Sequence, residues 1–421
     1  MSVRSRDSLP WRRVNPRRET ALLAAAAVAA SLAMLWGWSW NVRFNDYGTE
    51  ASASFTALLH GHVAVFLRSA PAYGASLLLR APFALPASLA GGGARLVYRL
   101  SALPCLLAIA GLGIWLARDL RRAGGGLPAA ALAVAICAAN PITYRVLQLG
   151  HPEELLGGAL CVAAVLLAQR GRINLAALAL GLSIANKQWA LLAIGPVLMA
   201  APDRRLRTLM LAAASALALL APIMLASSSL AAGTGRLAAT ATGTLFHPWQ
   251  VLWFFGPRGH WLPSMSPYIP RGFRLPPAWL GGRAHMLIVG LSVPLTWWAM
   301  RRRGAPANAL LLLALLLLLR CWLDPWDNVY YPLPFIAALA AWESSGARRA
   351  PVFAAAATGA TWLIFWYLPN HVSVDLQAIS FLVPSTLALA ALAAAVYRLR
   401  PAPRLTSREL PRLTRARGVP S

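Results

Sequence analysis

Long apolar runs, separated by short polar or arginine-rich segments, follow one another along almost the whole chain. The first extends from Thr20 to Val42, and similar runs recur as far as about residue 400. A helix of about 20 apolar residues is long enough to cross the ~30 Å hydrocarbon core of a bilayer. The pattern therefore predicts an all-α polytopic membrane protein, with about twelve transmembrane helices in a single domain over residues 20–400.

The composition agrees with this pattern and narrows the function classes. Apolar residues make up 58% of the 421 residues and charged residues 12%, against roughly 45–50% and 25% in soluble domains. The net charge of +26 is spread through short loops, which favours the lipid bilayer over nucleic acid as the partner. The cysteines show no metal-ligand spacing, and P-loop, GxGxxG and HExxH motifs are absent. Nucleotide-binding and zinc-protease functions therefore lack their usual signatures.

Arginine clusters separate the apolar runs and set the predicted topology. They lie in the N-terminal head and at 118–122, 170–172, 204–207, 301–303, 348–349 and 398–417. Basic residues in short loops mark the cytoplasmic side, so both termini are expected there. Residues 1–19 form a basic cytoplasmic tail, and residues 401–421 a disordered basic tail near anionic lipid. The first apolar run exceeds a signal-peptide core of about 7–15 residues and is expected to be retained.

With this topology the titratable side chains gather on the extracytoplasmic side. All the histidines and most of the acids fall there, and two long outer loops are predicted at about 43–95 and 227–282. Loops of that length are often functional. The stretch that follows Glu50 is too apolar for a free loop, so we expect interfacial helices in the first outer loop. The two loops would form the roof of an active site.

Two hairpins are too short to cross the bilayer. Between Arg172 and Arg204 the only polar break is "ANKQW". Each arm has about 13 residues, or ~20 Å of helix, which is less than ~30 Å. The arms should therefore meet inside the membrane, with Lys187 and Gln188 at their apex. The segment "LDPWDN" (323–328) should be the apex of a second short hairpin. Both would border a cavity that opens to the outside and to lipid.

The first candidate residues follow the first span. Asp46 and Glu50 lie four residues apart, so a helix would place both on one face,. They could equally be solvated carboxylates at the bilayer edge. Next along the chain, "LGHPEELLGGAL" contains His151, Glu153 and Glu154. Proline and acids in a first turn also suit any helix N-terminus, at about 0.3–1 kcal/mol per charge.

Lys187 is a cation in an apolar environment, which must be paired, neutralised or bound to an anion. It would either bind an anionic substrate together with Arg320 or form an internal salt bridge with Asp324 or Asp327. His247 and Trp249 lie in an aromatic cluster that could also be an interfacial belt,. The segment "LDPWDNVYY", which includes Asn328 and Tyr331, could be a proline turn with interfacial aromatics,.

Taken together, these strings resemble the GT-C superfamily of polytopic membrane glycosyltransferases. The resemblance rests on three features: an acid just after the first span, interfacial helices in the first outer loop, and short helices that meet in the membrane. "GHPEELLGGAL", "GLSIANKQWALLAIGPVLMAAP", "FHPWQVLWFFG" and "LDPWDNVYYPLPFIAALAAWE" are most similar to glycosyltransferase family 87. That family comprises bacterial polyprenyl-phosphate-mannose-dependent mannosyltransferases and many relatives. The likeness covers roughly residues 20–400.

The resemblance implies roles for the candidate residues. Asp46 would be the catalytic base, with Glu50 and Glu153 as supporting acids. The donor phosphate would be bound by Lys187, Arg320 and His247. Possible substrate-binding residues are His151, Gln188, Trp249, Asp324, Asp327, Asn328 and Tyr331. Several GT-C families carry two adjacent acids where this chain has Asp46 alone, which leaves the role of Glu50 open and argues against a dedicated metal.

The implied function is inverting transfer of a sugar, expected to be mannose, from a polyprenyl-phosphate donor to a lipid-linked or cell-envelope glycan. The donor is a co-substrate, and no cofactor is expected. The site would face outward from a bacterial plasma membrane; a single lysine, Lys187, among 39 basic residues is typical of a GC-rich bacterial genome. The alternatives are a transporter or flippase of a lipid-linked or anionic solute, and a ligase or polymerase of lipid-linked oligosaccharides.

Overall fold

The structure is a computed structural model. It describes residues 16–38, 46–226, 229, 246–260, 270–277, 280, 283–302, 305–346 and 350–397. The basic C-terminal tail, nearly all of the N-terminal tail and much of the predicted outer loop 227–282 lie outside these residues. In the described part all regular secondary structure is helical, apart from one isolated β-bridge between Arg258 and Arg274. The all-α prediction is therefore confirmed.

Within the described residues, seven helical segments are long and apolar enough to cross a membrane. They are Arg18–Gly37, Ala94–Arg122, Leu127–Leu149, Pro202–Leu225, Ala305–Leu323, Val352–Asn370 and Val374–Tyr397. Four apolar segments are shorter, namely Gly74–Leu89, Ile173–Asn186, Gln188–Ala200 and Ala284–Met300. A multi-pass membrane protein has this arrangement. The count of twelve spans and the GT-C fold remain predictions.

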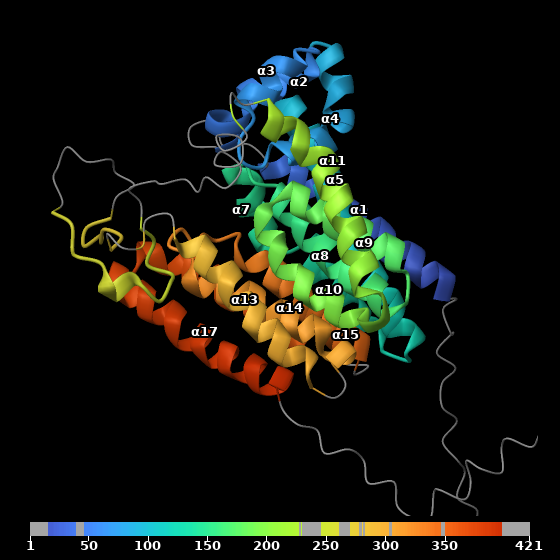
Figure 1. Ribbon diagram of the computed structural model, residues 1–421, viewed down its shortest axis with the longest axis vertical. Helices are drawn as coiled ribbons and strands as arrows, with labels where there is room; N and C mark the ends of the chain where they lie inside the picture. Colours follow the sequence, from blue (N-terminus) through green and yellow to red (C-terminus); the bar gives the residue numbers. More distant parts are fainter. Residues whose placement is uncertain are drawn as a thin grey trace, which may run out of the picture.

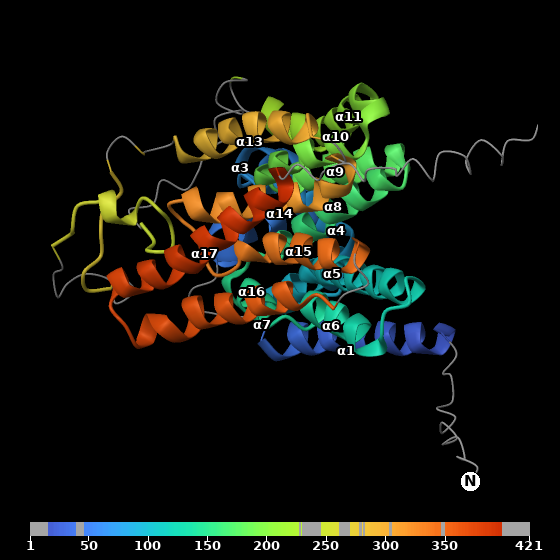
Figure 2. The same cartoon turned by 90° about the horizontal axis from the view of Figure 1, so that it is seen from below.

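The helices form one bundle (Figure 1). Its first half contains α1 (Pro16–Trp38), α5 (Ala94–Arg122), α6 (Leu127–Ala138), α7 (Pro141–Leu149), α8 (Glu153–Gln169), α9 (Ile173–Asn186), α10 (Ile194–Ala200) and α11 (Arg205–Leu225). Its second half contains α13 (Ala284–Met300), α14 (Ala309–Leu323), α15 (Pro332–Gly346), α16 (Val352–Trp362) and α17 (Val374–Tyr397). Seen from below, α8, α14 and α15 lie between α13 on one side and α1 on the other (Figure 2), and α17 lies along one edge of the bundle in Figure 1.

The central helices pack closely because small residues line their contacts. A Cβ added at Gly158 would lie 3.2 Å from the Pro334 backbone, so α8 and α15 are in near contact there. One added at Gly157 would lie 2.9 Å from the Trp189 ring and 3.0 Å from the Asn186 side chain. The first turns of α8 therefore lie directly against the end of α9.

The predicted short hairpin at Lys187 is confirmed. Helix α9 has 14 residues, or ~21 Å at 1.5 Å per residue. Lys187 follows it in an extended conformation, with φ −153° and ψ 130°, and a 3-10 helix over Gln188–Ala193 leads into α10. The chain also turns between α14 and α15, at residues 324–331, as predicted.

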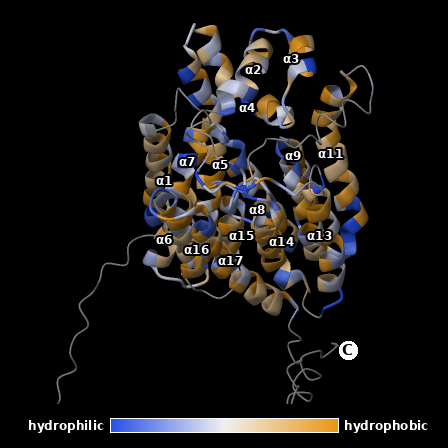
Figure 3. Cartoon of the chain, turned by 90° about the vertical axis from the view of Figure 1, so that its left-hand side faces the viewer, coloured by the Kyte–Doolittle hydropathy of each residue, from blue (hydrophilic) through white to orange (hydrophobic). Residues whose placement is uncertain are grey.

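Three helices lie beyond one end of the bundle. These are α2 (Ser52–Leu59), α3 (Val63–Ser69) and α4 (Gly74–Leu89), all from the predicted first outer loop (Figure 3). Their buried aromatic and aliphatic side chains pack against one another and against α5 and α11. The helices predicted in this loop are confirmed, whereas their position in a lipid interface remains a prediction.

Three of the arginine clusters lie at the opposite end of the bundle. The clusters at 118–122, 170–172 and 204–207 lie at the C-terminal end of α5, in the α8–α9 turn and at the α10–α11 turn. Arg170 contacts Asp119, and the two turns line one recess, so the three clusters are neighbours. The N-terminal end of α1 and the C-terminal end of α17 lie at this end as well (Figure 3). This separation of arginines from the acid-rich end matches the predicted topology, in which the arginine-rich end is cytoplasmic.

Candidate active site

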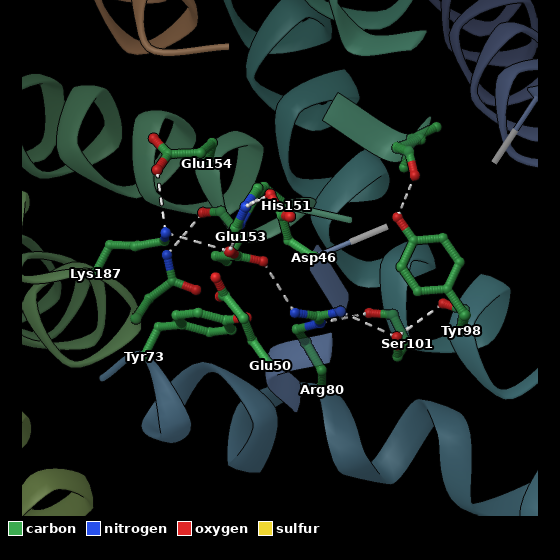
Figure 4. Close-up of polar contacts among 12 residues, drawn as sticks. Asp46, Glu50, Tyr73, Arg80, Tyr98, Ser101, His151, Glu153, Glu154 and Lys187 are labelled. Carbon is green, nitrogen blue, oxygen red and sulfur yellow. Dashed lines mark hydrogen bonds and ion pairs between the residues drawn. The ribbon is translucent and has the colours of Figure 1, made fainter. Parts of the chain in front are cut away.

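Three interruptions of the helices meet inside the bundle below α2–α4. Helix α7 ends at Gly150, whose φ of 94° is left-handed and favours glycine,. His151 and Pro152 follow, and α8 begins at Glu153. Asp46 comes directly before a π-helix over Tyr47–Ala51. Together with the apex at Lys187, these breaks bring acidic and basic side chains from distant segments together (Figure 4).

Glu153 lies at the centre of this arrangement. Its side chain is fully buried and contacts three basic groups. Oε2 accepts a hydrogen bond from Nη1 of Arg80 at 3.2 Å, and Oε1 lies 2.8 Å from Nδ1 of His151 and 3.3 Å from Nζ of Lys187. A buried carboxylate requires such partners because leaving water costs several kcal/mol per ion.

His151 connects Glu153 to Asp46. Its Nε2 lies 2.9 Å from Oδ2 of Asp46, so each ring nitrogen faces a carboxylate oxygen. Burial alone would lower the pKa of His151, but the hydrogen bonds to Asp46 and Glu153 raise it to about 9. At neutral pH the imidazole is therefore protonated and donates to both acids.

Glu154 forms a second branch of contacts. Its Oε1 lies 3.4 Å from Nζ of Lys187, and its Oε2 lies 3.5 Å from Nη1 of Arg320. The Arg320 guanidinium also lies over the ring of Tyr331, 4.1 Å from its centroid, and over the ring of Trp189, at 4.8 Å. Glu154 is buried like Glu153, so both acids of the "HPEE" segment are paired with cations.

Two further residues complete the arrangement: Arg80 in α4, and Tyr73 directly before that helix. Arg80 is buried in an apolar helix, and besides Glu153 it donates to the carbonyl and hydroxyl oxygens of Ser101, each at 3.0 Å. Tyr73 donates its hydroxyl hydrogen to Glu50 at 2.9 Å, and Lys187 lies over the Tyr73 ring at 4.7 Å. Sequence reasoning missed both residues. A single arginine among apolar residues in "ASLLLRAPF" was the available signal.

The charges of this group balance. Four acids and four basic groups form what we call the charge cluster: Asp46, Glu50, Glu153, Glu154, Arg80, His151, Lys187 and Arg320. With His151 protonated, its net charge is zero. Lys187 is thus paired internally, which was one of the two readings of the sequence. Its partners are the acids of α8 and not Asp324 or Asp327, because Gly157 lets α8 approach the end of α9.

Accessibility separates the members of the charge cluster. The Asp46 side chain is 44% exposed and that of Lys187 16%, whereas Glu153 is completely enclosed. Within the described part of the chain, Oδ1 of Asp46 has no hydrogen-bond partner. Asp46 is therefore accessible from outside the protein, whereas Glu153 contacts only its neighbouring side chains.

The other predicted site residues form a second polar group on the α14–α15 turn. His285 contacts Asp324 with Nε2 3.0 Å from Oδ2, and the Trp326 backbone N–H donates to Oδ1. Burial, followed by the neighbouring charge of Asp324, raises the pKa of Asp327 well above its usual range. The side chain of Asn328 accepts a hydrogen bond from the next residue in the chain.

His247 belongs to this second group. Its backbone N–H donates to the carbonyl of Pro325, and its ring stacks on Trp249 at 5.6 Å. Burial lowers the pKa of His247 to about 4, so the ring is neutral at pH 7 when no anion is bound beside it. Tyr331 joins the two groups through its contact with Arg320. Gln188 instead points to the α3–α4 connection, where it donates to the carbonyl of Ala72.

Among the residues that the structure describes, no three His, Cys, Asp or Glu side chains are arranged to hold a metal ion. The charge cluster instead places an accessible carboxylate beside a histidine and buried cations. No protein-family model matches the chain, and no curated protein matches it. The resemblance to membrane glycosyltransferases thus remains a prediction from the sequence.

Proposed function

We propose that this protein is an inverting glycosyltransferase that moves a sugar, expected to be mannose, from a polyprenyl-phosphate donor to a hydroxyl of a lipid-linked or envelope glycan. The observation that supports the proposal is the position of Asp46. Its exposed carboxylate is bonded through one oxygen to the buried His151–Glu153 pair, and its other oxygen is open. A general base needs this combination of fixed orientation and access to a proton.

The reaction would be a single displacement. Asp46 removes the proton of the acceptor hydroxyl, and the hydroxyl oxygen attacks the anomeric carbon from the face opposite the phosphate. A new carbon–oxygen bond forms as the bond from the anomeric carbon to the phosphate oxygen breaks. Its electron pair leaves with the polyprenyl phosphate, and the configuration at the anomeric carbon inverts. A positioned base typically contributes about 10²–10⁴-fold to such a step.

Lys187 is the group best placed to stabilise the leaving phosphate. Its Nζ lies 3.3 Å from Glu153 and 3.4 Å from Glu154, and 16% of the side chain is exposed. A bound phosphate would compete with these two acids for the ammonium, which has three N–H donors. Arg320 is enclosed and contacts Glu154 at 3.5 Å, so it would act on the phosphate from behind Lys187. His247 would bind the phosphate by donating a ring N–H hydrogen bond, which a neutral imidazole can do.

The test is sugar transfer from radiolabelled polyprenyl-phosphate mannose into a membrane extract. Asp46→Asn should lower the rate by about 10²–10⁴-fold, because an amide cannot take up the proton. Asp203→Asn is the matched control, since this exposed acid lies at the arginine-rich end of the bundle. It should leave the rate unchanged. Undiminished transfer by a folded Asp46→Asn protein would refute the role of Asp46.

A second arm separates the enzyme from a transporter. The wild-type protein in sealed vesicles is supplied with the labelled donor, and the label is analysed both for its side of the membrane and for its covalent attachment. Transfer produces a new labelled glycan, whereas transport moves unchanged donor across the membrane. If donors carrying mannose, glucose and arabinose all remain unchanged, the glycosyltransferase proposal fails.

A further inference from the structure

At the arginine-rich end of the bundle lies a recess that the proposed sugar transfer does not use. It has a volume of about 840 Å³ and lies between the α8–α9 turn and the α10–α11 turn. Its polar lining consists mainly of Gln169, Arg172, Asn174, Asp203, Arg204 and Arg207, and we call it the basic recess. Helix α8 separates it from the charge cluster by 17 residues, or ~25 Å.

The arginines of the basic recess differ from others in the bundle. Within the described part of the chain, the side chains of Arg172, Arg204 and Arg207 form no ion pair, hydrogen bond or cation–π contact. By contrast, Arg170 in the same turn pairs with Asp119 and lies over Trp115. Three positive charges against the single negative charge of Asp203 leave the basic recess with a net charge of +2. Such a surface attracts anions, and arginine forks bind phosphate well.

Apolar side chains continue from the basic recess along the outside of the bundle. Leu175 lines the recess and is 44% exposed, and Leu178, one turn further along α9, is 45% exposed. On α11, Met210 lies three residues beyond Arg207 and is 62% exposed. Residues three apart share a helix face. An exposed apolar surface therefore begins where the arginines end, as lipid chains require.

We propose that the basic recess binds the phosphate headgroup of an anionic phospholipid, whose acyl chains lie along the exposed faces of α9 and α11. A soluble phosphate would use the arginines but would leave these apolar faces uncovered. A zwitterionic lipid would gain little from the net positive charge. An anionic lipid matches both features, because basic pockets between membrane helices bind such headgroups.

The test measures binding of radiolabelled phosphatidylglycerol to the purified full-length protein in a neutral maltoside detergent. The triple variant Arg172→Gln, Arg204→Gln, Arg207→Gln should bind about a hundredfold more weakly, since each basic residue contributes about fivefold near a lipid surface. The control triple variant Arg118→Gln, Arg122→Gln, Arg301→Gln removes equal charge from the same end and should bind as the wild type does. The three arginines of the control variant are exposed. Each single arginine variant of the basic recess should bind the lipid about fivefold more weakly, which gives an independent measurement.

Three results would overturn the proposal. An equal loss of lipid binding in both triple variants would mean that the lipid is attracted to the whole arginine-rich end and that the basic recess is not a specific site. Full binding by the variant of the basic recess would exclude the recess directly. Displacement of the lipid by glycerol 3-phosphate at similar concentrations would assign the recess to a soluble phosphate. Phosphatidylcholine should not compete, and the outcome does not depend on whether the protein transfers sugar.

Discussion

Replacing Glu153 by glutamine should destabilise the protein more than almost any other change of one charge. The glutamine keeps the size of the side chain but removes its negative charge. Arg80, His151 and Lys187 all contact Glu153 at 2.8–3.3 Å, in a position with no exposed area. The neutral charge cluster would then carry +1. Removing one partner of a buried ion pair typically costs about 3–5 kcal/mol, because the remaining charge is left unpaired.

A comparison with an exposed pair makes this magnitude testable. Asp119 contacts Arg170 and Arg122, whose side chains are 41% and 71% exposed. Exposed ion pairs contribute about 0–1 kcal/mol, so Asp119→Asn should cost at most about 1 kcal/mol. Unfolding can be followed by tryptophan fluorescence in mixed micelles with increasing dodecyl sulfate, since Trp189 lies beside the charge cluster.

A double-mutant cycle then tests the reason for the loss. Lys187→Met alone leaves an excess negative charge, whereas Glu153→Gln with Lys187→Met returns the charge cluster to neutrality. Coupled neighbours typically deviate from additivity by about 0.5–3 kcal/mol, so the double variant should be more stable than the sum of the single losses predicts. If Glu153→Gln costs no more than Asp119→Asn, or if the two losses simply add, charge balance does not stabilise this site.

Two further predictions concern the pH and the packing of the site. The pKa of His151 is about 9 in the folded protein, against an ordinary value of 6.5 for the unfolded chain. The contribution of its protonation to folding stability is therefore complete below pH ~6.5 and is lost as the pH rises through ~9. Thermal stability of the wild type should fall over that range by up to ~3 kcal/mol; a His151→Gln variant with the same slope would contradict this assignment. Gly157→Ala should cost about 1–3 kcal/mol by displacing Trp189, whereas the control Gly111→Ala, which meets no atom within 4 Å, should be neutral or slightly stabilising; equal stability of the two would refute the close approach of α8 to α9.

Features set by local sequence pattern were predictable. The apolar runs and the arginine clusters that separate them indicated the helices and the ends at which they turn. The apex at Lys187 followed from chain length alone, because two arms of about 13 residues cannot each cross a bilayer. The helices of α2–α4 followed from the apolar character of a segment that was too long for a free loop.

Features that depend on long-range pairing were not predictable in the same way. Arg80 meets Glu153, 73 residues away, and Asp46 meets His151, 105 residues away. The sequence offered several acids as partners for Lys187, and no pattern distinguished the acids of α8 from those near residue 325. Lys187 pairs with the acids of α8 because Gly157 packs against Trp189, and this packing depends on how α8 and α9 are placed in three dimensions.

The position of Glu153 and Glu154 in the first turn of α8 would suit any helix N-terminus, which offers about 0.3–1 kcal/mol per charge. That energy is sufficient for exposed acids. These two are buried, and burial costs several kcal/mol per ion before pairing. The helix dipole alone therefore cannot account for them, and three separate segments supply Arg80, Lys187 and Arg320 as counterions. A purely structural helix start could avoid the whole cost with serine or threonine. Glu153 is better explained by what it orients, namely a protonated His151 directed at the accessible carboxylate of Asp46. Glu154 is better explained by the two cations that it holds beside this site, Lys187 and Arg320.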